Sequence, residues 1–250
     1  ETARANDLYS PFLTYGGTDT IYGGLGNDII IGGSGGDDQA TDQVPAGTVT
    51  VDADGYLTRE GGLAVRGDII YGDVADSAVD GNDEVLFGDN GYVQRNLEGL
   101  ILEVKTRYYI AEIDGATYVD YPNLGGDDAI DFAVGNKGAE IIMGGYGHDL
   151  IHGGLFDIAT DIILGDNGIT TRINGQFILA GTRSTDPGSG GQDDIHGGPG
   201  HDILLGGPSD DWIVGHDGDD YIYGDGGSDV LWGGTAGAAE ENFRLADGET

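Results

Sequence analysis

The 250-residue sequence has no cysteine, and it has few basic residues. Without cysteine, neither disulfide bonds nor thiolate metal sites can form, so the fold must be stabilised in another way. Only 10 Lys and Arg residues stand against 45 Asp and Glu residues, which gives a formal net charge of −35. Such a polyanion repels nucleic acids and anionic lipids and attracts cations. We therefore expect cations as partners and no nucleic acid.

Proline and long apolar runs are also scarce. No run approaches the ~18 apolar residues of a membrane-spanning helix, so no membrane span is expected. With 6 prolines, the chain resembles neither collagen nor a typical disordered linker. Glycine is abundant instead, at 50 residues, far above the usual share of about 7%. Because the chain opens on Glu1 without an initiating Met, we expect it to be a fragment of a longer protein.

The glycines belong to a nine-residue repeat. Ten nonapeptides in register fill residues 14–40, 135–152 and 188–232. Their sixth position is Asp in nine repeats and Glu140 in the other, and their eighth is Ile or Leu in nine, failing only at Gln39. Degenerate units of the same kind recur elsewhere in the chain. So many matches at fixed spacing indicate a repeat architecture.

Each nonapeptide predicts a turn followed by a short strand. Glycines in the turn supply positive φ and let neighbouring backbones approach closely. In the three-residue strand, the middle side chain points to one face and its neighbours to the other. Two turns and two strands close one coil, and stacked coils place the eighth-position side chains in a narrow core between two parallel sheets. In the third block this core consists of Ile195, Leu204, Ile213, Ile222 and Leu231.

Stacking also aligns the sixth-position carboxylates in rows, one coil above another at about 4.8 Å. Asp193, Asp211 and Asp229 fall on one edge of the stack, and Asp202 and Asp220 fall on the other. Rows of carboxylates so close repel one another strongly unless a cation lies between them. Because the available ligands are oxygens alone, from carboxylates and turn carbonyls, the pattern favours Ca²⁺ over the more demanding Mg²⁺.

We predict several bound Ca²⁺ ions, held by the acidic residues at the sixth position and by their equivalents in degenerate units. These candidate metal ligands are Asp19, Asp28, Asp37, Asp68, Glu140, Asp149, Asp161, Asp193, Asp202, Asp211, Asp220 and Asp229.

The repeat resembles that of the RTX (repeats-in-toxin) calcium-binding proteins, written G-G-x-G-x-D-x-U-x. Residues 197–205 match this pattern at every defined position. The resemblance implies a parallel β-roll with Ca²⁺ between the turns of successive coils, bound by sixth-position Asp side chains and by carbonyls of the glycine turns. It also implies a secreted bacterial protein, exported unfolded by a type I system and folded in extracellular calcium.

Insertions interrupt the repeats. The motif Gly-Asp-Asn-Gly occurs at residues 88–91 and again at 165–168, and both copies are followed by sequence outside the nonapeptide pattern. Asn174-Gly175 and Asp54-Gly55 each lie between two runs of β-forming residues, which predicts two β-hairpins. A longer insertion covers residues 92–121. We therefore predict an all-β fold: a parallel β-roll, which is a right-handed β-helix-like solenoid, decorated with β-hairpin insertions.

These patterns divide the chain into six segments. They are the tail of a preceding unit with the first roll block (1–40), hairpin insertions with degenerate repeats (41–134), the second roll block (135–168), a hairpin insertion (169–187), the third roll block (188–234) and a C-terminal segment without an assignment (235–250). Two interpretations of the hairpins stay open. They cover the side of the roll or its exposed edges, or they form a recognition or assembly surface on a rigid scaffold.

Other candidates for chemistry are weak. The histidines fall at turn or outward strand positions, which predicts solvated side chains and no zinc site; they are His148, His152, His196, His201 and His216. Paired acids such as Asp127-Asp128 are interpreted as one calcium ligand beside a solvated neighbour. The sequence contains no H-E-x-x-H motif, and we expect no enzymatic activity.

The sequence therefore predicts a calcium-binding β-roll module of a large secreted or cell-surface bacterial protein, with a structural, adhesive or assembly role. Its partners would be calcium ions and, through the hairpins, further copies or an extracellular partner. The alternative is the Ca²⁺-dependent C-terminal folding and secretion domain of a secreted protease or lipase whose catalytic domain lies outside this sequence. The hairpins favour the first hypothesis, because a module used only for secretion has no need of them.

Overall fold

The computed structural model describes a defined set of residues, and within them the chain is all-β with no helix. None of these residues therefore belongs to a helix that could cross a membrane. The described residues are 8–9, 20–23, 27–33, 49–51, 57–59, 69–71, 84–106, 110–113, 116–119, 128–130, 138–154, 158–185, 187–188 and 190–234.

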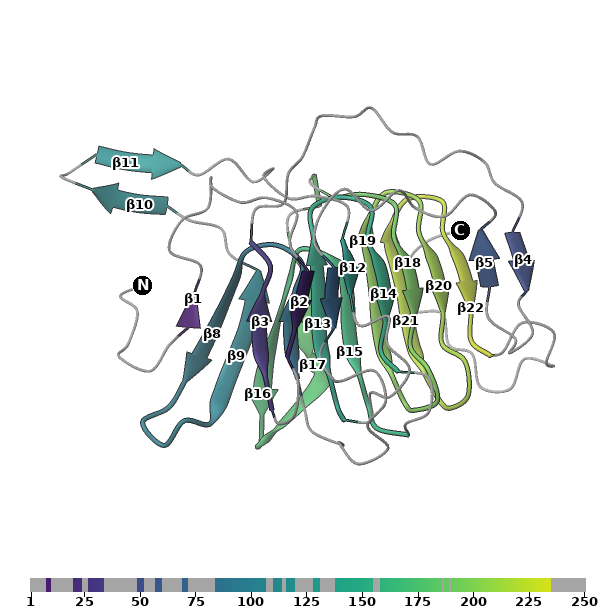
Figure 1. The fold of residues 1–250 in the computed structure, drawn as a ribbon, viewed down its shortest axis with the longest axis horizontal. Coiled ribbons are helices and arrows are strands. Elements are labelled where there is room, and N and C mark those ends of the chain that lie inside the picture. The colour runs from purple at the N-terminus through teal and green to yellow at the C-terminus, as the bar shows by residue number, and fades with distance from the viewer. Residues whose placement is uncertain are drawn as a thin grey trace.

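Two parallel sheets form the body of the molecule, with their strands succeeding one another from β2 and β3 at one end to β22 at the other (Figure 1). Sheet I contains, in spatial order, β2 (Thr20–Tyr22), β6 (Ile69–Tyr71), β12 (Ala129–Ile130), β14 (Leu150–His152), β18 (Asp194–His196), β20 (Trp212–Val214) and β22 (Val230–Trp232). Sheet II contains β3 (Ile29–Ile31), β7 (Val85–Phe87), β13 (Ile141–Gly145), β15 (Ile162–Asp166), β19 (Ile203–Pro208) and β21 (Tyr221–Gly226).

Strands of the two sheets alternate along the chain, so each strand of sheet I is followed by one of sheet II before the chain returns to sheet I. Neighbours within a sheet are in parallel register: Ile195 pairs with Ile213, and Leu204 with Ile222. The prediction of an all-β fold with parallel sheets is confirmed.

The eighth-position side chains fill the space between sheets I and II. Ile195, Leu204 and Ile213 have no exposed surface, Ile222 is 1% exposed, and Leu231 packs against the same cluster at its end. One large aliphatic side chain per strand makes a core that is long along the stack and narrow across it. The predicted core of the third block is therefore confirmed.

A third, antiparallel sheet, here called the cover sheet, is built mainly from the insertions. Its five strands lie in the order β1 (Leu8–Tyr9), β8 (Gly91–Arg95), β9 (Ile101–Thr106), β16 (Gly168–Ile173) and β17 (Gln176–Ser184). The predicted turn at Asn174-Gly175 joins β16 to β17, with φ of 52° and 88° at the two residues, as a type I′ turn requires.

Two separate antiparallel pairs account for the remaining strands. They are β4 (Val49–Val51) with β5 (Leu57–Arg59), which is the hairpin predicted around Asp54-Gly55, and β10 (Ile110–Ile113) with β11 (Ala116–Val119).

The cover sheet packs on the outer face of sheet II and creates a second core. Phe87, Met143 and Leu164 are at most 1% exposed, and they form one cluster with Val93 and Val104 of the cover sheet. Seventh- and ninth-position side chains do point away from the first core, but on β7, β13, β15 and β19 of sheet II they are covered. The interpretation that the hairpins cover the side of the stack is thus confirmed for the hairpin at Asn174-Gly175.

The last glycine of each Gly-Asp-Asn-Gly motif explains how the cover sheet begins. A Cβ on Gly91 would lie 2.5 Å from the Phe87 ring, and a Cβ on Gly168 would collide with the Leu164 side chain. At both positions the chain leaves sheet II and folds back tightly over the strand that it has just completed. Only glycine permits this close approach.

The inner core generates a first prediction. Leu204→Ala should destabilise the calcium-loaded protein by about 2–5 kcal/mol, because a fully buried side chain is replaced by a cavity between closely packed sheets. Leu97→Ala, at a residue that is 94% exposed, is the control and should change stability by no more than about 0.5 kcal/mol. Urea unfolding in saturating Ca²⁺ measures both, and equal midpoints would contradict the assignment of the core.

Candidate calcium sites

A row of hydrogen-bonded carboxylates runs along the turns that lead into sheet I. Each carboxylate oxygen Oδ1 accepts a hydrogen bond from the backbone N–H of the acidic residue one coil earlier. The donors and acceptors are Asp128 N–H to Asp149 (2.8 Å), Asp149 N–H to Asp193 (2.9 Å), Asp193 N–H to Asp211 (2.9 Å) and Asp211 N–H to Asp229 (3.0 Å). We call this set the first row.

A second row has the same geometry along the turns that lead into sheet II. Glu140 N–H donates to Asp161 Oδ1 at 2.9 Å, Asp161 N–H to Asp202 Oδ1 at 3.0 Å, and Asp202 N–H to Asp220 Oδ1 at 3.0 Å. The third block therefore divides its acidic residues between two edges, as the repeat spacing predicts.

The other carboxylate oxygen of these residues is turned into the protein. Asp193 and Asp211 are each 2% exposed and Asp220 is 6% exposed. Their Oδ2 atoms are buried and accept no hydrogen bond from any described residue. Burying a carboxylate oxygen without a donor costs at least about 1–3 kcal/mol, and an ionised one costs more. Such atoms indicate that a cation belongs beside them.

Backbone carbonyls converge on the same places. A Cβ built on Gly197 would lie 2.7 Å from Asp202 Oδ2 and 3.0 Å from the carbonyl oxygen of Gly215, which belongs to the next coil. Gly206 stands in the same relation to Asp211 Oδ2 and to the Gly224 carbonyl. Oxygens from two successive turns thus face a space that a glycine leaves open. Carboxylate and carbonyl oxygens are the donor set of Ca²⁺, so the residues present fit this ion.

Side chains alone do not complete such a site. Within the described residues, no group of three or more His, Asp or Glu side chains is arranged to hold a metal ion. Backbone carbonyls of the glycine turns must therefore supply part of any coordination shell. A calcium site of this kind is set by backbone conformation as much as by the carboxylates.

Burial makes the carboxylates hard to ionise. Desolvation raises the pKa of Asp211 from its usual 3.8 to about 8 and that of Asp220 to about 6. The pKa of Asp193 is raised well above its usual value, first by burial and then by the nearby charges of Asp166 and Asp211. Near neutral pH, Asp193 and Asp211 therefore need either a proton or a cation.

Most of the predicted ligands lie where the two rows run. Eight of them belong to a row: Asp149, Asp193, Asp211 and Asp229 to the first, and Glu140, Asp161, Asp202 and Asp220 to the second. Asp28 also precedes a strand of sheet II, and its carbonyl accepts from Val85 N–H at 3.0 Å. Asp19, Asp37 and Asp68 lie outside the described residues.

Two further acidic residues occupy equivalent places but were not named among the candidate ligands, although the pair Asp127-Asp128 was interpreted as containing one. Asp128 opens the first row, and the carbonyl of Glu84 accepts from Ile141 N–H at 3.0 Å, one coil before Glu140 joins the second row. Ile130 and Leu86 follow them at the spacing between the sixth and eighth positions. This spacing was the available signal, and at Asp128 it was accompanied by Gly126 at the fourth position of the repeat.

Asp166, from the second Gly-Asp-Asn-Gly motif, was also missed. It is 1% exposed, its Oδ1 accepts from Gly191 N–H at 3.0 Å, and its Oδ2 is buried without a hydrogen bond from the described residues. Burial, reinforced by the charge of Asp149, raises its pKa to about 10. The motif thus brings an additional carboxylate to the turns of the first row, and its recurrence was the only signal in the sequence.

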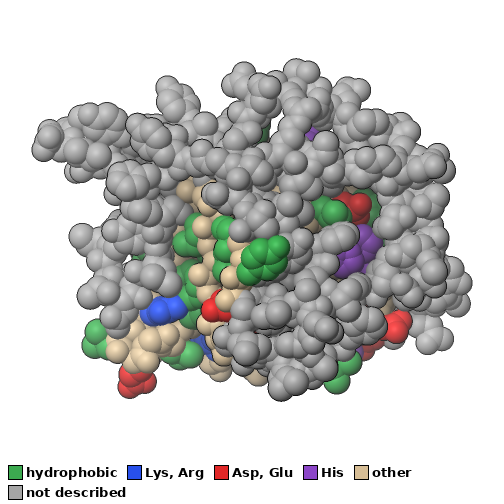
Figure 2. Space-filling model, viewed as in Figure 1, with side chains coloured by type: hydrophobic (Ala, Val, Ile, Leu, Met, Phe, Trp, Pro, Cys, Tyr) green, Lys and Arg blue, Asp and Glu red, His purple; other side chains and the backbone are tan. Residues whose placement is uncertain are grey.

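The prediction that the histidines are solvated is wrong for His196 and His216, which are 2% and 4% exposed. His152, His196 and His216 stack, with ring centroids 4.4 and 5.3 Å apart, and His196 Nδ1 lies 3.0 Å from His216 Nε2. The reason is that ninth-position side chains of sheet I lie directly above one another, and the turn at His216 folds over them. Figure 2 shows histidine side chains gathered on one face of the molecule.

The rows distinguish two adjacent acids. Asp211→Ala should lower Ca²⁺ affinity at that turn about tenfold or more, because it removes a charged acceptor worth about 1.5–3 kcal/mol and the inward Oδ2 together. Asp210→Ala is the matched control, since Asp210 is exposed and accepts one hydrogen bond from Ser228 N–H. A calcium titration followed by circular dichroism compares them. Equal affinities would show that the register is wrong.

The raised pKa values of Asp211 and Asp220 predict how pH acts on the metal-free chain. Their protonated forms stabilise the fold fully below pH 3.8, and this stabilisation is lost as pH rises towards about 6 for Asp220 and about 8 for Asp211. Without metal, β-structure should therefore be greater at about pH 5 than at about pH 8. With limiting Ca²⁺ the order should reverse, because the ligands must be deprotonated. Far-UV circular dichroism tests both, and an unchanged order in calcium would contradict the sites.

Comparison with known proteins agrees with this geometry. The model of the RTX calcium-binding nonapeptide repeat matches the chain in four copies, at residues 14–38, 125–157, 188–204 and 205–235. No curated protein and no solved structure matches the chain. The last two copies contain every residue of the two rows from Asp193 onwards. Over these four stretches, the chain carries the RTX calcium-binding nonapeptide repeat.

Proposed function

We propose that this chain is a calcium-binding β-roll module of a large secreted or cell-surface bacterial protein, with a structural, adhesive or assembly role and no enzymatic activity. The observation that carries the proposal is the pair of carboxylate rows, in which the buried Oδ2 atoms of Asp193, Asp211 and Asp220 face glycine turns without a hydrogen-bond donor from the described residues. The regular alternation of parallel strands between sheets I and II supports a β-roll solenoid as the scaffold of these rows.

Each calcium ion would be held between two successive turns on one edge of the stack. On the edge that leads into sheet II, Asp202, Asp220 and the Gly215 carbonyl would hold it. On the other edge, Asp193, Asp211 and the carbonyl of Gly206 have the equivalent places. A bound Ca²⁺ supplies the positive charge that these buried oxygens require.

The chain's own residues prepare these sites. The Oδ1 hydrogen bonds fix each carboxylate against the preceding coil, so that Oδ2 stays directed at the turn. Glycine at the first position leaves the space between the oxygens open, as at Gly197 and Gly206. Without a cation, repulsion between the aligned carboxylates destabilises the fold, and the thin core supplies little packing energy against it. Metal binding therefore contributes directly to the free energy of folding. Such coupling suits a protein that is exported unfolded and folds in extracellular calcium.

The cover sheet supports a structural role. Strands β8, β9, β16 and β17 add a second core to the outer face of sheet II, beyond what calcium binding requires. Arg172 ties the two hairpins together, since its Nε donates to the Ile101 carbonyl at 2.8 Å and its Nη1 to the Gly175 carbonyl at 2.7 Å. The result is a reinforced rod-like body of the kind that a load-bearing or assembling protein needs.

Calcium should fold the chain in a way that other salts cannot reproduce. At about 1 M NaCl the screening length falls to about 3 Å, so general repulsion between the acids is removed. We nevertheless expect the chain to stay largely unfolded in NaCl with chelator near neutral pH, to fold poorly in Mg²⁺, and to fold cooperatively in Ca²⁺, because each ion links two turns.

Far-UV circular dichroism across the three salts tests this expectation on the full chain. A β-sheet spectrum in Ca²⁺ alone supports the proposed sites. Folding in NaCl with chelator would mean that the aspartates are merely a solvating surface, and the proposed function would be withdrawn.

A further inference from the structure

The cover sheet ends differently on its two sides. On one side, the two-residue strand β1 pairs antiparallel with β8, with Leu8 opposite Val93 and Tyr9 opposite Tyr92. On the other side, the nine-residue strand β17 pairs with β16 and is the last strand of the sheet in the described part of the chain. Figure 1 shows β1 beside β8 at the outer end of the molecule.

The two ends occupy equivalent places in the repeated sequence. Leu8 lies six residues before Thr14, the first residue of the first nonapeptide block, and Thr182 lies six residues before Gly188, the first residue of the third. Tyr9 and Arg183, the residues that follow them, correspond in the same way. In the repeated pattern, β1 therefore stands where the C-terminal part of a β17-type strand stands.

The register across the sheet has the same repeat. One cross-strand row runs through Leu8, Val93, Val104, Thr170 and Thr182. Val93, Val104 and Thr170 have no exposed surface and Thr182 is 8% exposed, so these side chains face sheet II. The row begins at Leu8 and ends at Thr182, which occupy equivalent places in the repeated sequence. Continuing it by one step would place a Val93-type residue beside Thr182.

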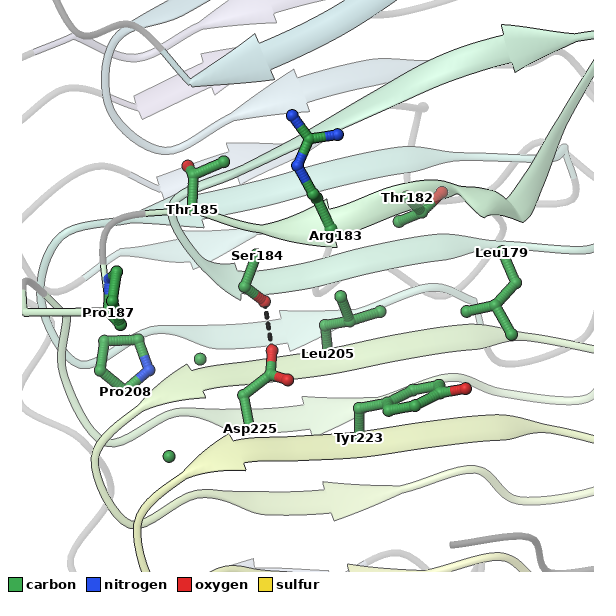
Figure 3. A pocket seen from close by; sticks show the side chains of 12 residues that line it. Leu179, Thr182, Arg183, Ser184, Thr185, Pro187, Leu205, Pro208, Tyr223 and Asp225 are labelled. Carbon is green, nitrogen blue, oxygen red and sulfur yellow. Dashed lines mark hydrogen bonds between the residues drawn. The ribbon is translucent and has the colours of Figure 1, made fainter. Parts of the chain in front are cut away.

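A groove lies at the place of that next strand (Figure 3). It is a cavity of about 620 Å³ between β17 and the outer faces of β19 and β21. Leu179, Leu205 and Tyr223 line it, and near the other end Ser184 Oγ hydrogen-bonds to Asp225 Oδ2. Strand β21 lies beyond β19, one strand further than the cover sheet extends, so the groove has the apolar lining that a covering strand would bury.

The backbone of β17 is oriented for pairing on this side. Thr185 N–H donates to the Asn167 carbonyl at 2.7 Å, on the β16 side. Because N–H groups of an antiparallel strand alternate between its two neighbours, those of Ser184 and Thr182 point towards the groove. In an incoming antiparallel strand, the residue opposite Thr182 would accept a hydrogen bond from Thr182 N–H through its backbone carbonyl, and its own N–H would donate to the Thr182 carbonyl.

We propose that the outer edge of β17 docks a second copy of this chain, whose β8 pairs with it antiparallel and continues the cover sheet from molecule to molecule. The inference rests on the assembly role proposed above and names the surface that performs it. Val93 of the incoming copy lies opposite Thr182 over Tyr223, and its Tyr92 lies opposite Arg183. The pairing repeats the register that β1 makes with β8.

In the incoming copy, β1 leaves the edge of β8 to make room. β1 contributes only two residue pairs there, whereas β17 extends over nine residues, of which Thr182, Arg183 and Ser184 follow its irregularity in regular register with β16. Each molecule then offers one β17 edge and one β8 edge, so the contact is heterologous and propagates head to tail rather than closing a dimer.

Because the protein has no cysteine, single cysteines can report on this pairing. Tyr92→Cys and Arg183→Cys proteins are mixed in Ca²⁺ under mild oxidation, and the mixed disulfide is quantified by mass spectrometry. In the proposed register the two positions form a non-hydrogen-bonded pair, whose Cα atoms lie about 4.5 Å apart, within disulfide range. The control replaces Arg183→Cys with Gln176→Cys, which is exposed at the hairpin tip of the same strand.

We expect the mixed disulfide of the Tyr92 and Arg183 variants to exceed that of the control at least about tenfold. Adding Leu8→Asp to the Tyr92→Cys protein should raise the yield further, because a weakened β1 competes less for β8. Circular dichroism of the same samples reports folding. Equal cross-linking of folded control and test pairs overturns the docking and leaves the calcium role intact. Selective cross-linking that needs no calcium overturns the calcium role and leaves the docking intact.

Discussion

The structure depends on one contact, the hydrogen bond from the backbone N–H of an acidic residue to the carboxylate of its counterpart in the next coil. It recurs at 2.8 to 3.0 Å along both rows. The contact sets the register between coils, and it holds anionic side chains inside the protein where burial opposes their charge. Two other features of the turns follow from accommodating those charges: glycine lies beside them, and backbone carbonyls face the same space. This is the space that the proposed calcium ion would occupy.

The nine-residue period joins this polar system to an apolar one. Two residues after each row position comes the side chain that fills the core between sheets I and II, so one short segment supplies both the charge and the packing. Neither is sufficient alone. The core is one aliphatic side chain wide, and the cover sheet widens the apolar interior only on the sheet II side, through Phe87, Met143 and Leu164.

Much of the core and of the two rows was predictable because the place of a residue follows from its position within its own nonapeptide. The core residue Ile213 and the row residue Asp211 follow from position in the nonapeptide, and the Asn174-Gly175 turn follows from its own chemistry. The burial of His196 was not predictable, since it depends on which side chains lie one coil away. Asp166 was not predicted for a related reason. Its neighbours, among them Asp149 and Gly191, come from other coils, and no spacing within its own repeat indicates that they lie there.

The hydrogen bonds of both rows all have the same direction: the N–H of the earlier coil donates to the carboxylate of the later one. The stack therefore has a polarity, and its ends make different chemical demands. For this hydrogen bond alone, a coil added before the first needs only a backbone N–H group, which every residue except proline possesses. A coil added after the last must bring a carboxylate at the sixth position. The row of hydrogen bonds can thus be continued in one direction by almost any sequence and in the other only by the acidic repeat, whereas each further calcium site of the proposed kind needs carboxylates from both coils.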